Sequence, residues 1–241
     1  MNLMSGRAKW GKVGMRGLAA VGAMALLGVP VVMGQGGEMQ QKLADVKAVA
    51  AENKQQLRQY EWTETTQLTL KGDDKEPSAS RCRYGPDGQI QKTLIGVPPP
   101  PPPSGGRMKK KIIAKKKEEI KDYMSQVKSL LSIYVPPDPQ RMEEAYRAGK
   151  FALNPMPGAV NFIFTDYAQA GDKMTISFDT AAKKIMSVDV NTYLDEEKDA
   201  VTLHVQMGTI PDGPNYAQRT VLSAAAKKLV VTTTNSNYQK L

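Results

Sequence analysis

Hydrophobic and polar positions alternate with two different periods along this chain, and the change of period divides it into elements. Within residues 38–57, apolar side chains such as Leu43 and Val46 recur near helical spacing, which predicts an amphipathic helix. From Tyr60 to Lys71 the apolar positions recur at every second residue instead, which predicts a strand with one apolar face.

Further strands follow with recognisable turns. Residues 78–84 and 89–95 flank the tetrapeptide Gly85-Pro86-Asp87-Gly88, and this combination predicts a hairpin because proline fixes one φ and glycine accepts a positive φ. From residue 159 onward, short alternating segments follow one another almost without interruption. With about nine strands in all and short connections, the sheet is predicted to be antiparallel.

A different composition separates the two groups of strands. Residues 96–107 contain six consecutive prolines and a Ser-Gly-Gly joint, which predicts a stiff, extended linker. Residues 108–149 predict a helical insert: a long helix from about Met108 to Tyr134, and a short helix that begins after Asp138 as N-cap.

The first 34 residues have the composition of a secretory signal peptide. Arg7, Lys9, Lys12 and Arg16 give a positive start, and residues 18–33 are uncharged and mostly apolar. This apolar stretch is shorter than the roughly 20 residues that span a bilayer core. We therefore expect cleavage near Gly34 and a periplasmic or secreted mature protein, in which residues 35–241 form a single domain; an uncleaved anchor is the alternative.

The net charge of +9 is unevenly distributed. Without the four basic residues of the leader it is +5, and residues 107–121 alone carry +6. The basic character therefore belongs to one segment rather than to the whole surface. The chain has a single cysteine, Cys82, so an intramolecular disulfide is excluded, and we expect this side chain to be buried on a strand.

The order of elements resembles the periplasmic lipoprotein-carrier and lipoprotein-receptor superfamily, whose members have a half-barrel fold. The likeness rests on residues 57–95, with their strand pair around Tyr84-Gly85-Pro86-Asp87-Gly88, and on residues 174–190 (MTISFDTAAKKIMSVDV). The resemblance implies an α+β fold: a curved antiparallel β-sheet with an N-terminal helix and a two-helix insert. It also implies a lipid or a lipoprotein acyl chain as the partner. We expect a non-enzymatic protein without a cofactor.

In such a fold, seven residues would line an apolar concavity: Trp62, Leu68, Leu70, Phe162, Phe164, Ile176 and Phe178. A lipid-like ligand would gain about 0.8 kcal/mol for each methylene group buried there. The alternative is that the same side chains form an ordinary core packed against the helices.

The start of the long helix offers a second candidate site. Seven basic residues gather there: Arg107, Lys109, Lys110, Lys111, Lys115, Lys116 and Lys117. The segment lacks the aromatic side chains that stack on bases, so nucleic acid is not expected as a partner. An anionic envelope surface is one interpretation. A solvated helix start without a dedicated partner is the other.

Candidate chemistry elsewhere is sparse. His204, the only histidine, is interpreted as a surface residue, and the acidic run 195–199 as a solvated turn, so no metal site is predicted. No linear motif for nucleophilic catalysis or phosphate binding occurs. A hydrolase that uses a carboxylate pair remains a third hypothesis, since such pairs leave no linear motif.

Overall fold

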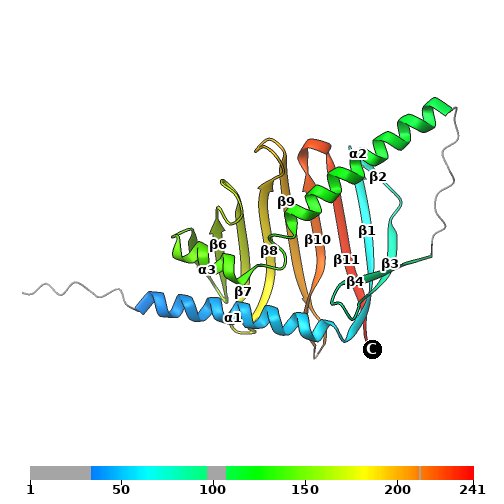
Figure 1. The fold of residues 1–241 in the computed structure, drawn as a ribbon. Helices are drawn as coiled ribbons and strands as arrows, with labels where there is room; N and C mark the ends of the chain where they lie inside the picture. The colour runs from blue at the N-terminus through cyan, green and yellow to red at the C-terminus, as the bar shows by residue number, and fades with distance from the viewer. Residues whose placement is uncertain (1–33, 97–106, 212) are drawn as a thin grey trace, which may run out of the picture.

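A computed structural model describes residues 34–96, 107–211 and 213–241 as one large open sheet with helices on one face (Figure 1). The helices are α1 (Gly34–Leu57), α2 (Arg107–Leu131) and α3 (Pro139–Arg147), with a short 3-10 turn η1 (Ala225–Lys227). The strands are β1 (Tyr60–Leu70), β2 (Asp73–Asp74), β3 (Ser78–Tyr84), β4 (Ile90–Ile95), β5 (Phe151–Met156), β6 (Ala159–Thr165), β7 (Lys173–Asp179), β8 (Lys184–Tyr193), β9 (Ala200–Thr209), β10 (Asn215–Ala224) and β11 (Leu229–Lys240).

All eleven strands belong to one antiparallel sheet. Its order is β4-β3-β1-β11-β10-β9-β8-β7-β6-β5, with β2 paired to β1. Strands β5 to β11 form a continuous meander, and the first strand joins this meander by pairing with the last, from Tyr60↔Lys240 to Leu70↔Leu229. The predicted α+β class and the curved antiparallel sheet are therefore confirmed.

The predicted number of strands was too low, for two physical reasons. Strand β2 contains only two residues, too few to show a period. Strand β5 contains Pro155, which cannot donate to a ladder and so reads as a break in the sequence; the structure places it in an edge strand, where proline is tolerated.

The predicted hairpin and helical segments form with small changes of boundary. Gly88 adopts a φ of 74°, and its N–H donates to the carbonyl of Gly85 at 2.9 Å, which closes the β3–β4 turn. Asp138 caps α3 by accepting from the N–H groups of Gln140 and Arg141. Helix α1 begins earlier than predicted, and α2 ends at Leu131 rather than Tyr134. Residues 1–33 of the predicted signal peptide and 97–106 of the predicted linker lie outside the described residues.

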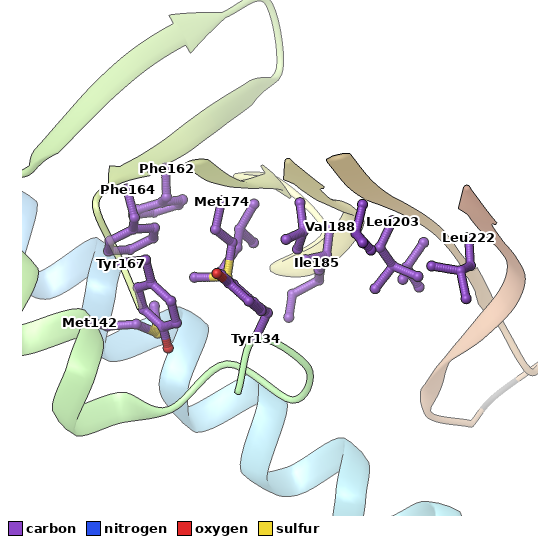
Figure 2. Close-up of a cluster of buried hydrophobic side chains, with 14 of the residues drawn as sticks. Tyr134, Met142, Phe162, Phe164, Tyr167, Met174, Ile185, Val188, Leu203 and Leu222 are labelled. Atoms are coloured by element: carbon purple, nitrogen blue, oxygen red, sulfur yellow. The ribbon is translucent and has the colours of Figure 1, made fainter. Parts of the chain in front are cut away.

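The hydrophobic core lies between the meander and the three helices. Along β7, for example, every second residue is buried, and these residues are Met174, Ile176 and Phe178. Helix residues Val46 and Val127 belong to the same cluster. Met142 joins it from the helical side (Figure 2). This core involves β6 to β11, whereas all six residues of β4 are exposed, so the β4–β3–β1 end of the sheet lies outside the main packing.

A buried hydrogen-bond network fixes the corner between α2 and α3. Tyr134, which has no exposed surface, donates its hydroxyl hydrogen to Asp172 Oδ2 at 2.5 Å and lies 2.8 Å from Thr192 Oγ1. The Asp172 carboxylate, 2 % exposed, also accepts backbone N–H groups from residues 167, 168 and 169. This one carboxylate therefore ties the helical insert to the β6–β7 loop.

Replacing Tyr134 should test that network. The substitution Tyr134→Phe removes a donor from a buried carboxylate, so we expect the free energy of unfolding to fall by about 1–3 kcal/mol in urea denaturation. The matched control is Tyr193→Phe, because the Tyr193 hydroxyl donates to the Ala170 carbonyl in an exposed position. Equal decreases in the free energy of unfolding for the two variants would contradict a stabilising role for the Tyr134–Asp172 hydrogen bond.

Alkaline pH should also weaken the fold. Burial raises the pKa of the Tyr134 phenol, and its hydrogen bond to Asp172 raises that pKa further; burial likewise raises the pKa of Tyr123 and Tyr238. Below about pH 10 these phenols are neutral in both states, but above it only the unfolded chain ionises, so stability falls as pH rises. Urea midpoints measured from neutral pH upward should decline above about pH 10 and decline less in Tyr134→Phe. An identical alkaline slope in that variant would exclude Tyr134 as a contributor.

Candidate ligand-binding groove

Helix α2 packs on the sheet along only its C-terminal half. Tyr123 and Val127 are buried, while residues 114–119 are exposed. The reason lies in the sequence: the apolar stripe stops at Ile120, and Lys116 and Lys117 occupy the turn before it. Figure 1 shows the N-terminal half of α2 continuing past the strands. The N-terminal half of α2, which extends away from the sheet, therefore forms one wall of a groove.

Two contacts fix the point at which α2 leaves. The Tyr123 hydroxyl donates to Asp199 Oδ1 at 2.7 Å, which joins the helix to the loop between β8 and β9. The ammonium of Lys227, in the turn before β11, lies 5.3 Å from the centroid of the Tyr123 ring, within the range of a cation–π contact. Tyr123 is thus the last anchored residue before the helix separates from the strands.

The groove lies between this half of α2, the end of β1 and the β10–β11 turn. Its volume is about 910 Å³. This value falls within the roughly 300–1,000 Å³ typical of small-molecule sites. Its apolar side chains are Leu68 and Leu70 from β1 and Ile120 from α2, with Ala226 at the turn. All three large side chains are only partly buried, so apolar surface remains available there.

Lysines surround this apolar surface. Six of them line the groove, together with a single acidic residue, Glu119: Lys71, Lys75, Lys116, Lys117, Lys227 and Lys228. All six are exposed, and in the described part of the chain none of them forms an ion pair. The groove therefore combines an apolar floor with an uncompensated positive rim.

Backbone pairing brings the lysines that follow β1 close to those of the β10–β11 turn. The N–H of Lys71 donates to the carbonyl of Lys228 at 2.8 Å, directly beyond the register pair Leu70↔Leu229. Lys71 and Lys228 both adopt positive φ, 56° and 49°, which reverses the chain at these two strand ends. The lysines of the two turns are consequently neighbours although they are far apart in sequence.

The seven residues predicted to line a ligand site fall in three places. Leu68 and Leu70 line the groove. Phe162, Phe164, Ile176 and Phe178 lie in the core, each no more than 3 % exposed. Figure 2 shows Phe162 and Phe164 in this core. Trp62 belongs to a separate aromatic cluster, where its ring stacks on Tyr238 at 5.5 Å and its indole N–H donates to Asn235. A ligand role for the core residues and Trp62 stays a prediction.

The predicted basic segment is also divided. Lys116 and Lys117 line the groove, and Lys111 and Lys115 are exposed on the projecting part of α2. Arg107, Lys109 and Lys110 belong to the same helix, but their side chains lie outside the described part of the structure.

Sequence reasoning missed seven lining residues, which are Lys71, Lys75, Glu119, Ile120, Ala226, Lys227 and Lys228. The local sequence around Lys71, Lys75, Lys227 and Lys228 carries no ligand signal, because these residues lie in connections between strands and come together through the pairing of β1 with β11. Ile120 was identified only as part of a helix stripe; its position where that stripe ends was the available signal.

The remaining candidates show structural or surface roles. His204 is half-exposed on β9, and its Nδ1 lies 2.6 Å from Asp189 Oδ1 on the neighbouring strand. Within the acidic run, Asp199 accepts from Tyr123 and Glu196 pairs with Lys198. No cluster of three or more metal-binding side chains occurs among the described residues. The oxygens of the buried Asp172 are already occupied by four donors, and the carboxylate-pair hypothesis stays untested.

Comparisons with known proteins find likeness in structure alone. The chain matches no family model and no curated protein. A DUF1329 family protein from Desulfovibrio piger aligns with a TM-score of 0.40 at 8 % identity, covering 83 % of this chain and 92 % of that chain. A LolA superfamily protein from Nitrosomonas europaea aligns at 0.38 and 9 %, covering 84 % and 93 %. An outer membrane lipoprotein-sorting protein domain from Vibrio parahaemolyticus aligns at 0.37 and 9 %, covering 83 % and 92 %.

The names of the last two structures agree with the superfamily that the order of elements resembles. Since these TM-scores lie below 0.5, the chemistry of the groove is argued from this chain's own residues. Across the described ranges, the helices are too short or too polar to cross a bilayer.

The thiol of Cys82 should be inert in the folded protein. Cys82 has no exposed surface, and burial raises the pKa of its thiol, with the nearby Glu64 carboxylate raising it further. We expect alkylation by iodoacetamide to be slower than in urea by on the order of 100-fold. Leu94→Cys in a Cys82→Ser background is the control, because residue 94 is 59 % exposed and should react at once. Comparable rates for native and unfolded Cys82 would show that this end of the sheet opens readily.

Proposed function

We propose that this protein binds the acyl chain of a lipid-like ligand in the groove between α2 and the β1–β11 end of the sheet. The observation that carries the proposal is the partly buried apolar surface of Leu68, Leu70 and Ile120 inside a groove of about 910 Å³. Acyl chains need no directional bonds and gain about 0.8 kcal/mol for each methylene group removed from water. A site with an apolar floor and no buried acid–base pair suits binding rather than catalysis.

The same proposal places the protein outside the cytoplasm. The support is the sequence of residues 1–34, with its basic start and its short uncharged stretch, which has the form of a cleavable leader. We propose that cleavage near Gly34 releases residues 35–241 as one domain into the periplasm or the medium. The protein would then act in the envelope as a carrier or receptor for lipids, and not as an enzyme.

Two isoleucines of α2 provide a matched test. Ile120 lines the groove, whereas Ile112 is 56 % exposed on the same helix and is not among the lining residues. The substitution Ile120→Ala removes about 2 kcal/mol of apolar contact, so a neutral monoacylglycerol should bind about 30-fold more weakly. Binding is measured by displacement of the neutral fluorophore N-phenyl-1-naphthylamine. We expect Ile112→Ala to bind like the original protein; absence of any displacement in the original protein would refute the proposal.

A second candidate function rests on the projecting part of α2. Lys111 and Lys115 are exposed there beside Ile112, an arrangement that favours contact with an anionic envelope surface. Each basic residue near such a surface is worth about 1 kcal/mol at low salt.

Vesicle co-sedimentation distinguishes this candidate from the groove. The double variant Lys111→Gln/Lys115→Gln should bind phosphatidylglycerol vesicles about 30-fold more weakly at low salt. The control is Lys121→Gln/Lys128→Gln, which removes the same charge from the packed half of the helix. Equal vesicle binding by both variants would remove the surface hypothesis without affecting the groove.

A further inference from the structure

Six lysines line the groove. They come from three separate parts of the chain: α2, the β1–β2 region and the β10–β11 turn. Glu119 is the only acidic residue among the lining side chains, so the lining has a net charge of +5. Like charges gathered at one rim repel each other, and no ion pair in the described part of the chain offsets that repulsion. A site with this charge is complementary to an anion.

We propose that the ligand of the groove is a single-chain lipid with a phosphate monoester headgroup. This inference rests on the proposed function, because it places the acyl chain on Leu68, Leu70 and Ile120. It adds that the headgroup lies at the rim, between Lys116 and Lys117 of α2 on one side and the lysines of the two turns on the other.

The number of lysines favours a phosphate monoester over a carboxylate. A phosphate monoester carries about −1.5 to −2 charge at neutral pH and offers three strong acceptor oxygens. Each lysine ammonium supplies three donors, so several lysines can share one phosphate group. A carboxylate, with one charge and two oxygens, would leave most of the rim uncompensated.

The position of the lysines favours a bound lipid molecule over a bilayer surface. Lys71, Lys75, Lys227 and Lys228 line the same groove as Leu68 and Leu70, and their charges therefore surround its apolar floor. A flat membrane would instead contact the projecting residues Lys111 and Lys115. The rim and the floor together fit an amphiphile whose charged end and apolar end are held in one site.

Three probes used with the full protein separate the contributions of headgroup and chain. The first is a lysophosphatidic acid, the second is the monoacylglycerol with the same chain, and the third is glycerol phosphate. Binding is measured by calorimetry below the critical micelle concentration, at low salt and at raised salt. We expect the lysophosphatidic acid to bind at least about 30-fold more tightly than either other probe, with the advantage over monoacylglycerol shrinking as salt screens the rim.

Matched variants assign the difference to the rim. Lys116→Gln/Lys117→Gln should weaken lysophosphatidic acid binding about 30-fold and weaken monoacylglycerol binding by a much smaller factor. Lys227→Gln/Lys228→Gln should do the same from the opposite side of the groove. The control Lys121→Gln/Lys128→Gln carries the same charge change outside the groove and should bind both lipids as the original protein does.

The possible failures are distinguishable. Equal affinity for lysophosphatidic acid and monoacylglycerol would overturn the headgroup assignment while leaving the acyl-chain proposal intact. A fatty acid that matches lysophosphatidic acid would overturn the phosphate assignment. Tight binding of glycerol phosphate alone would overturn the assignment of an amphiphilic ligand. Failure of all lipids to bind would refute the proposed function itself.

Discussion

The pairing of the first strand with the last is the interaction on which the rest of this structure depends. Strand β1 follows α1 near the start of the described chain, yet its neighbour in the sheet is β11, at the end of the sequence. That antiparallel ladder extends the meander of β5–β11 by β1, β3 and β4 and makes one sheet of all of them. It also sets Leu68 and Leu70 beside Val231 and Leu229, so that the apolar face continues beyond the packed core. Without this register there would be no groove floor and no meeting of the turn lysines.

The second determinant is the point at which helix α2 stops being amphipathic. From Ile120 to Val127 its apolar side chains face the sheet, and the helix is held there by packing and by the Tyr123–Asp199 hydrogen bond. Before Ile120 the same face carries lysines, whose ammonium groups cannot be buried without a large desolvation cost. The helix therefore separates from the strands in the turn between Tyr123 and Ile120. This separation leaves the groove between α2 and β1. The lysines that prevent the helix from packing also give the groove its positive charge.

The two halves of the sheet differ in how completely side chains fill the space between strands and helices. Around β6 and β7, aromatic side chains such as Phe162 and Phe164 fill the space under the helices. Around β1, helix α2 contributes one large apolar side chain, Ile120, and space remains. The buried Asp172 carboxylate is already engaged, because its hydrogen bonds join the helical insert to a loop.

Much of the fold could be predicted from the sequence because it follows from local patterns. Period-two alternation located β1 and β6 to β11, the Gly85–Gly88 turn located the β3–β4 hairpin, and the N-cap Asp138 located the start of α3. Strand β5 was missed because Pro155 interrupts the pattern.

The site was only partly predictable. Leu68 and Leu70 were identified from alternation, but the same alternation on β6 and β7 marks packed core residues such as Phe162, and a period cannot distinguish a covered face from an open one. The lysines of the turns come together through long-range pairing, which no local signal reports.

The most direct measurement of the central claim is a set of intermolecular nuclear Overhauser effects between a bound acyl chain and labelled methyl groups. With methyl-labelled leucine and isoleucine, chain protons of a bound lysophosphatidic acid should contact Ile120, Leu68 and Leu70. Ile112 and Leu94, exposed elsewhere on the helix and the sheet, should show no such contacts. Contacts confined to Ile112, or none to Ile120 at a saturating lipid concentration, would contradict the account.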